Sequence, residues 1–169
     1  ECRDLSNALS KTIKKTRRFT KKWPVQSENN DLALERLKEV LNLKNLPHII
    51  ECFDISHVSG TFVVASMVRF ADGKADKKSY RRFKIKSFVG NDDFRSMEEV
   101  VGRRYGRLLK AGQTFPNLVV IDGGAGQVSS ALNAFKDLNT QAPALVGLAK
   151  REESIVFPDE RDDLVLDPR

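Results

Sequence analysis

Two aspartates stand in, or directly after, apolar runs of the sequence. Asp54 lies within the run 49–55, and Asp122 follows the run 118–121. A carboxylate in such a setting is costly to bury unless it is paired or binds a cation. Hard carboxylate oxygens suit Mg²⁺ or Mn²⁺, and such ions activate water for attack on a phosphodiester. The two aspartates therefore predict a metal-dependent nuclease site, provided that the fold brings them together.

Asp122 is followed by a glycine-rich turn, 123–126, which opens into a helical pattern. Glycines let backbone amides approach a ligand closely, and α/β proteins commonly bind ligands at the carboxyl ends of buried strands. Asp-Gly is also an ordinary turn signal, so this stretch alone leaves a site and a plain turn equally open. A nucleotide-phosphate cradle is a weaker alternative, because no lysine stands at P-loop spacing, and we expect no nucleotide binding.

The elements that must position the aspartates follow from hydrophobic periodicity and turn signals. Apolar and β-branched patterns predict strands over 48–55, 61–70, 78–86, 118–121 and 144–148. Amphipathic patterns predict a helix capped by Asp31, a long helix capped by Asn91 or Asp92 and stopped by Gly112, and a helix after the glycine-rich turn.

This order, three antiparallel strands followed by alternating helix and strand, is the order of the ribonuclease H-like fold. We therefore expect an α/β protein with a five-stranded mixed sheet and helices on both faces. In that fold the first and fourth strands are parallel neighbours, which would bring Asp54 and Asp122 to the same end of the sheet. The interpretation that each aspartate only caps its own turn is the less favoured alternative.

Composition limits the class of protein. The chain has 29 Lys and Arg against 23 Asp and Glu, a net charge of +6 and a pI near 9.4, which is compatible with a polyanionic partner. Cys2 and Cys52 give neither a disulfide framework nor a zinc spacing, and Cys52 is predicted to be a small core residue. No apolar run approaches the roughly 20 residues of a membrane span, and no signal peptide is visible. We expect a soluble cytoplasmic protein.

Basic residues are concentrated in two regions. Residues 1–30 are predicted to be a solvated basic arm or linker, with a phosphate-binding role less favoured. Residues 31–169 are predicted to be the folded domain, truncated at the carboxyl terminus. Between Lys77 and Lys110 there are eleven Lys or Arg and four acids. We expect a phosphate track along one face of the third strand and along the long helix, with the strand face made of Lys78, Tyr80, Arg82, Lys84 and Lys86. The alternative is a charged edge strand that guards against aggregation.

A third group for the metal site is not assigned by the pattern. Glu98 shares the inward stripe of the long helix, whereas Glu99 points elsewhere and is interpreted as a surface charge. Neither glutamate is included in the predicted site.

Five ordered blocks carry a family resemblance: ECFDISH at 51–57, YRRFKI at 80–85, DDFRSMEEVVGRRY at 92–105, IDGGAGQ at 121–127 and GLAKR at 147–151. Together they closely resemble the carboxyl-terminal endonuclease domain of UvrC, a component of the ABC excinuclease, from about residue 31 onward. The resemblance implies a ribonuclease H-like, metal-dependent endonuclease that makes the 5′ incision in damaged double-stranded DNA during bacterial nucleotide excision repair. The implied partners are the excinuclease component UvrB and, upstream of it, UvrA.

The resemblance also carries residues over by position. Asp54 and Asp122 match the two family aspartates that bind the catalytic Mg²⁺ or Mn²⁺. Together with the charge pattern, it gives the residues expected to contact DNA: Arg82, Lys84, Arg104, Gln127 and Lys150.

The chain departs from the family in two places. The family's third catalytic residue is a histidine further along than this chain reaches, and neither His48 nor His57 matches it. Ala125 stands where the family commonly has a lysine, which removes a phosphate contact, and the glutamate that recurs in the family helix aligns with Glu99. The alternative function is a catalytically incomplete DNA-binding or scaffold module of the same repair complex.

Overall fold

Short apolar runs of the sequence pair into one mixed sheet, and longer amphipathic runs form the helices that pack on it. A computed structural model describes residues 28–58, 62–86, 92–150, 153–159 and 161–166. The helices are α2 (Glu28–Leu41), the short 3-10 helix η2 (Lys77–Ser79), α3 (Asp93–Lys110) and α4 (Ala125–Asp137). The strands are β1 (Ile49–Val58), β2 (Phe62–Ala71), β3 (Lys74–Ala75), β4 (Arg81–Lys84), β5 (Leu118–Asp122), β6 (Ala144–Ala149), β7 (Ser154–Val156) and β8 (Leu164–Val165).

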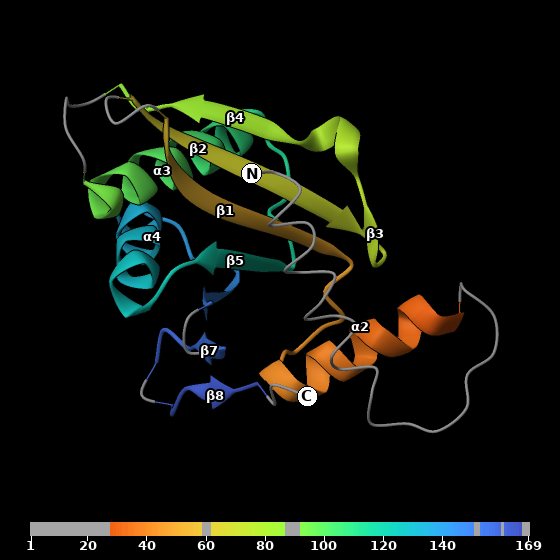
Figure 1. Cartoon of the computed structure of the whole chain (residues 1–169). Coiled ribbons are helices and arrows are strands. Elements are labelled where there is room, and N and C mark those ends of the chain that lie inside the picture. The colour runs from red at the N-terminus through yellow and green to blue at the C-terminus, as the bar shows by residue number, and fades with distance from the viewer. Residues whose placement is uncertain (1–27, 59–61, 87–91, 151–152, 160, 167–169) are drawn as a thin grey trace.

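The described residues form an eight-stranded sheet in the order β3-β2-β1-β5-β6-β7-β8, with β4 also paired to β2 (Figure 1). β1 is antiparallel to β2 and parallel to β5, and β5 is parallel to β6. The α/β ribonuclease H-like class is therefore confirmed, with the first and fourth predicted strands as parallel neighbours. The predicted count of five strands was too low, because β3, β7 and β8 have only two or three residues and give no periodic signal.

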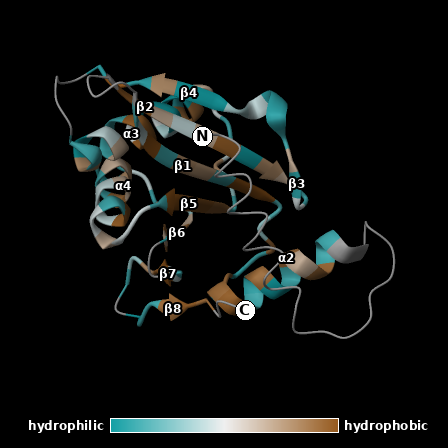
Figure 2. Ribbon diagram, viewed as in Figure 1, coloured by the Kyte–Doolittle hydropathy of each residue, from teal (hydrophilic) through white to brown (hydrophobic). Residues whose placement is uncertain are grey.

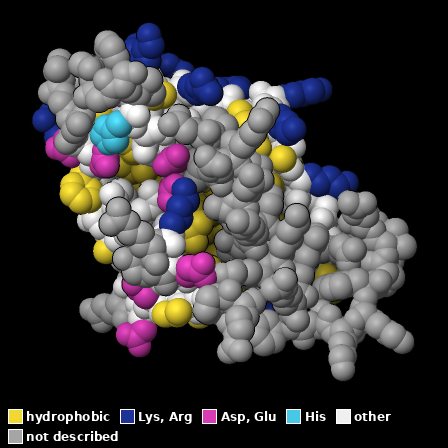
Figure 3. Space-filling model, in the orientation of Figure 1, with side chains coloured by type: hydrophobic (Ala, Val, Ile, Leu, Met, Phe, Trp, Pro, Cys, Tyr) yellow, Lys and Arg dark blue, Asp and Glu magenta, His cyan; other side chains and the backbone are white. Residues whose placement is uncertain are grey.

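The third predicted strand, 78–86, is only partly correct. Its first residues form η2, and the ladder with β2 covers the four residues of β4. Lys78 therefore does not belong to the strand face that carries Arg82 and Lys84. Lys and Arg side chains nevertheless line the edge of the molecule where β4 lies (Figure 3).

Helix α2 begins earlier than the sequence predicts. Asp31 lies inside the helix, which starts at Glu28, so the predicted Asp31 cap is wrong. The basic arm, apart from its last residues in α2, lies outside the described residues. Within the described ranges, none of the helices combines the length and apolar character needed to cross a bilayer.

Helix α3 begins and ends where the sequence predicts. The Asp92 side chain accepts a hydrogen bond from the Arg95 backbone N–H (3.0 Å), which satisfies a free donor of the first turn. The helix ends at Lys110, and Gly112 follows in the left-handed region (φ 61°) that favours glycine.

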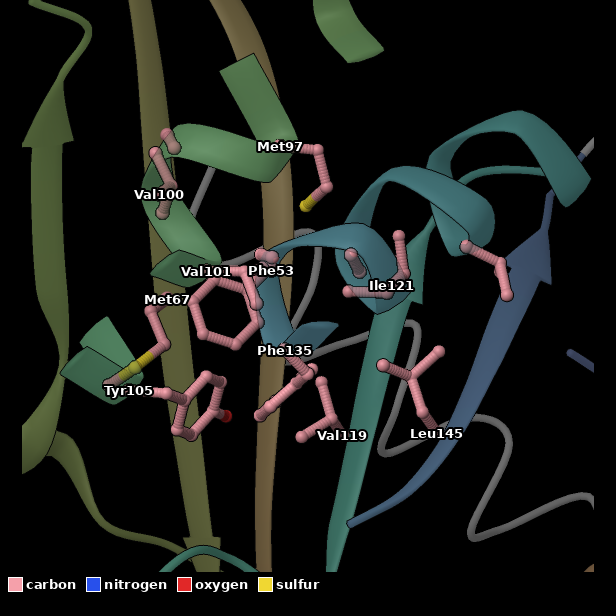
Figure 4. Packing of buried hydrophobic residues seen from close by; sticks show 14 of the residues in the cluster. Phe53, Met67, Met97, Val100, Val101, Tyr105, Val119, Ile121, Phe135 and Leu145 are labelled. Atoms are coloured by element: carbon pink, nitrogen blue, oxygen red, sulfur yellow. The ribbon is translucent and has the colours of Figure 1, made fainter. Parts of the chain in front are cut away.

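Two apolar layers sandwich the sheet. Figure 2 shows β5 as hydrophobic along its length, as expected of a central strand covered on both faces. The layer under α3 and α4 includes Phe53, Met67, Tyr105, Ile121 and Phe135, whose side chains pack together in Figure 4. The opposite layer joins α2 to the sheet through Leu34, Leu37, Cys52, Val68 and Val120. Helices therefore cover both faces, and the core role predicted for Cys52 is confirmed.

Strands β1 and β5 are also joined at their amino ends. Asn117, just before β5, accepts a hydrogen bond from the Ile49 backbone N–H through its side-chain oxygen (2.8 Å). Its own backbone N–H donates to the Ile49 carbonyl oxygen (2.9 Å). These two bonds continue the parallel ladder past its first paired residues.

Close packing behind Asp122 depends on a glycine in β6. A Cβ atom at Gly147 would lie 2.6 Å from the Gly123 carbonyl oxygen and 2.6 Å from Val128 Cγ2. We therefore expect Gly147→Ala to lower the free energy of unfolding by about 1–3 kcal/mol in urea titrations, because the backbone must move. The matched control is Gly102→Ala in α3, where the nearest atom, Ala134 Cβ, is 3.9 Å from the added carbon.

Since alanine has the higher helix propensity, Gly102→Ala should be neutral or stabilising by up to about 1 kcal/mol. Equal midpoints for the two variants would contradict the packing constraint at β6.

Candidate metal and DNA site

The parallel register of β1 and β5 aligns the two predicted aspartates. Phe53 pairs with Ile121, and Asp54 and Asp122 are the next residues of their strands. They therefore hold equivalent positions on the two central strands, at the same end of the sheet. Both are partly exposed, with 11% of the Asp122 side chain accessible to solvent.

A row of cross-strand partners extends from these aspartates in both directions. Arg82 of β4 pairs with Ser66 of β2, and Ser66 pairs with Asp54. On the other side, Asp122 pairs with Leu148 of β6. Because directly opposed residues on neighbouring strands project to the same face, the row places one arginine and two carboxylates on one face of the sheet. We call this face the acid face.

Two further predicted DNA contacts share the acid face. Lys84 pairs with Val64, which pairs with Ser56, two residues beyond Asp54. Lys150 is two residues beyond Leu148, just after the end of β6. Helix α2 belongs to the apolar layer on the same face, which includes Cys52 and Val120, two residues before Asp54 and Asp122, and Leu148, the partner of Asp122.

Lys150 forms an ion pair with Asp122. The Lys150 Nζ lies 2.5 Å from Asp122 Oδ2, and 45% of the lysine side chain is exposed. Nearby, burial and then the negative charges of Asp122 and Glu51 raise the pKa of the Cys52 thiol, which keeps it neutral in the core. The ion pair places a positive charge directly beside the Asp122 carboxylate.

The donor set fits a hard divalent ion. Mg²⁺ usually keeps several waters and takes one or two protein carboxylates, which is what Asp54 and Asp122 offer. Among the described residues, no group of three or more His, Cys, Asp or Glu side chains is arranged to hold a metal. The predicted metal-ligand role of the two aspartates therefore rests on their alignment, and it stays a prediction.

The turn after Asp122 is packed by its own helix and by α3. The Gln127 side chain lies over Gly123, so that a Cβ atom there would lie 2.8 Å from Gln127 Cγ. A Cβ atom at Gly126 would collide with the ring of Phe94, which is 51% exposed. The glycines thus permit close packing around the acid end of β5, and Gln127 lies beside the predicted site.

Arg104 occupies a different place from the other predicted DNA contacts. Its Nη2 donates to Glu51 Oε1 (2.6 Å) and its Nε to Glu51 Oε2 (3.2 Å), on the opposite face of the sheet from the two aspartates. The Tyr105 hydroxyl also donates to Glu51 Oε2 (2.9 Å). Glu51 is 1% exposed, so Arg104 supplies the charge that a buried carboxylate requires. Its predicted DNA contact stays a prediction.

The surroundings of Glu51 alter the chemistry of both its partners. Burial lowers the pKa of Arg104, but the hydrogen bonds and charge of Glu51 outweigh it, so the pKa is raised overall. Burial, followed by the charge of Glu51, raises the pKa of Tyr105 well above its usual value. Sequence reasoning missed this triad, although an acid within an apolar strand and an Arg-Tyr pair on a helix were both visible.

Glu99 is not the surface charge that the helical pattern indicates. Its side chain is 11% exposed, accepts from the Lys86 backbone N–H (2.9 Å) and pairs with Arg103 Nη1 (3.0 Å). It therefore joins α3 to the chain after β4. At the carboxyl end of β1, His57 Nε2 lies 2.9 Å from Asp93 Oδ1 and connects the strand to the start of α3.

The strand order and connections define a ribonuclease H-like α/β domain with an acid pair at the ends of its central strands. The family described as the UvrC RNase H endonuclease domain matches residues 38–169, and the chain belongs to this family.

The chain is similar to UvrABC system protein C of Methanococcus maripaludis, with 50% identity over 138 residues, 82% of this chain and 26% of the relative. The corresponding protein of Solibacter usitatus is 48% identical over 150 residues, 88% of this chain and 24% of the relative. This chain spans about a quarter of the length of the curated relatives it matches.

Among solved structures, human ENDOV has a TM-score of 0.45 at 14% identity, covering 81% of this chain and 64% of that chain. This is a partial structural likeness only.

Proposed function

We propose that this domain is the nuclease that makes the 5′ incision in damaged double-stranded DNA during UvrABC-type nucleotide excision repair, using Mg²⁺ or Mn²⁺. The observation that carries the proposal is the β1–β5 register, which aligns Asp54 with Asp122 in a chain of the UvrC endonuclease family. The whole-protein setting, with UvrB on the damaged DNA and UvrA upstream, is part of the same proposal.

Each residue of the acid face has a role in this proposal. Asp54 and Asp122 hold the divalent ion, which when bound activates water and stabilises the leaving oxygen. Arg82 and Lys84 hold backbone phosphates across β2 and β4, because their charges lie on the face that carries the two acids. Lys150, already beside Asp122, and Gln127 complete the contacts to the strand being cut.

The decisive experiment is a nicking assay on a lesion-containing duplex with UvrA, UvrB and the complete protein that contains this domain. We expect incision on the 5′ side of the lesion with Mg²⁺ or Mn²⁺, and no incision once a chelator has removed the divalent ion. Restored incision after excess Mg²⁺ is the control for damage by the chelator. Normal incision in the chelator would contradict a metal-dependent mechanism.

A catalytically incomplete DNA-binding or scaffold module is the second candidate. It is favoured by one observation, that no group of three metal-binding side chains occurs among the described residues. The complete protein distinguishes the two functions, since incision would be unchanged by Asp54→Asn or Asp122→Asn if the domain were only a scaffold, and would be lost if it were the nuclease.

A further inference from the structure

A second basic site lies away from the aspartates, between β4 and α3. A pocket of about 160 Å³ is lined by Phe83 and five arginines: Arg81, Arg82, Arg103, Arg104 and Arg107. Phe83 is 5% exposed and belongs to the core layer under α3. Arg81, two residues earlier on β4, projects to the same side, which is opposite to the acid face. We call this the arginine pocket.

Backbone carbonyl oxygens hold two guanidinium groups of the pocket in place. Arg81 Nη1 donates to the carbonyl oxygens of Tyr80 (2.8 Å) and Lys78 (3.1 Å), which fixes the group without neutralising it. Arg103 Nη1 donates to the Lys84 carbonyl oxygen (2.7 Å), and its guanidinium carbon lies 5.7 Å from the centre of the Phe83 ring. Because these side chains are already ordered, a ligand that binds them has a smaller entropic cost to overcome.

The pocket carries a surplus of positive charge. Glu51 compensates Arg104 and Glu99 compensates Arg103. Among the described residues, no carboxylate forms an ion pair with Arg81, Arg82 or Arg107. Arg82 projects to the acid face, so the uncompensated guanidinium charges on the pocket side of β4 are those of Arg81 and Arg107. Planar guanidinium forks suit phosphate oxygens better than they suit a monatomic anion.

We propose that the arginine pocket binds a backbone phosphate of the DNA at a distance from the incision point. This inference rests on the proposed nuclease function. Arg82 projects to the acid face and Arg81 to the other face of the same edge strand. DNA that crosses the acid face and passes over the β4 edge thus meets the arginine pocket next, so the strand is held on both sides of β4.

The test uses Arg81→Gln/Arg107→Gln in the complete protein, with DNA binding measured in EDTA so that no cutting occurs. Both arginines are exposed, and neither supports the Glu51 or Glu99 carboxylates. We expect affinity for a duplex to fall about tenfold or more. The slope of log K against log[salt] should become shallower by about 1 to 2, one for each lost phosphate contact.

Lys110→Gln/Lys136→Gln is the matched control, because it removes two exposed charges from α3 and α4 that do not line the pocket. A substrate series in which one duplex arm is shortened gives a second readout. Trimming the arm that reaches the pocket should weaken the wild type but not the Arg81→Gln/Arg107→Gln variant.

Arg81→Lys/Arg107→Lys retains the charge and protects the test against misfolding. It should keep the salt slope and recover part of the affinity, since only the forked geometry is lost. If Arg81→Gln/Arg107→Gln has the same affinity and salt slope as the control Lys110→Gln/Lys136→Gln, the proposal is overturned. Unchanged DNA binding with lost recruitment to the UvrB–DNA complex would also overturn it, and would identify an acidic protein surface as the occupant. Because DNA binding is measured without metal, its result does not depend on the outcome of the nicking assay, and the two proposals can fail separately.

Discussion

Replacing Asp54 or Asp122 by asparagine is expected to reduce DNA nicking by at least about 100-fold while leaving DNA binding intact. Loss of groups that merely orient metal ligands costs about 10- to 100-fold, so loss of a ligand itself should cost more. Asparagine keeps the size of the side chain but removes the negative charge that a hard cation requires. The measurement is single-turnover incision by the complete protein with UvrA and UvrB.

Asp72→Asn is the control for this substitution. Asp72 follows β2 at the other end of the sheet, is exposed, and pairs with His48 (2.8 Å). Its φ of 49° is one that asparagine tolerates well. Nicking should be unchanged. Mn²⁺ binding measured by electron paramagnetic resonance gives a readout that does not depend on activity. If Asp54→Asn cuts at the normal rate and binds Mn²⁺ normally, Asp54 is not a metal ligand.

The largest effect on stability is expected for Glu51→Ala. This change leaves the Arg104 guanidinium, with 16% of its side chain exposed, without its carboxylate, and leaves the Tyr105 hydroxyl without an acceptor. Breaking a buried ion pair on one side costs about 3–5 kcal/mol. For a domain of this size, the midpoint of thermal unfolding should fall by roughly 10 °C or more.

Two comparisons separate the buried pair from a general charge effect. Glu39→Ala removes a glutamate whose partner, Arg36, is exposed, and it should change stability by less than about 0.5 kcal/mol. Glu51→Leu/Arg104→Met replaces both charges by apolar groups and should recover much of the loss. If Glu51→Ala unfolds at the same temperature as Glu39→Ala, the buried triad does not stabilise the fold as described.

The central strands and the long helix were predictable because their signals are local. The apolar run that ends at Asp122 is short and is followed at once by glycines, which favours a buried strand over a helix, and Asp92 followed by the amphipathic pattern marks a helix start. The parallel pairing of β1 with β5, and hence the alignment of Asp54 with Asp122, followed from element order alone. This is the part of the candidate site that sequence reasoning reached.

The contacts that sequence reasoning missed depend on tertiary structure. Glu51 and Arg104 are far apart in the chain. Only the packing of α3 on β1 brings the Arg104 guanidinium, which by charge alone suits DNA, to the buried Glu51 carboxylate. Glu99 looked exposed on a helical wheel because the chain after β4, which covers it, is not visible in helical periodicity. Likewise, the sequence predicts a strand where the first residues form η2, because a short turn of this kind gives a weaker sequence signal than a period-two pattern.

Asn117 lies far from the two aspartates, yet its hydrogen bonds help to fix their relative positions. It is bonded to Ile49, five residues before Asp54, or about 16 Å along the strand. Side chains alternate with every residue, so a slip of one residue between β1 and β5 would turn one aspartate away from the other. The hydrogen bonds of Asn117 oppose that slip, and the spacing of the two carboxylates is thereby set from the opposite end of the sheet.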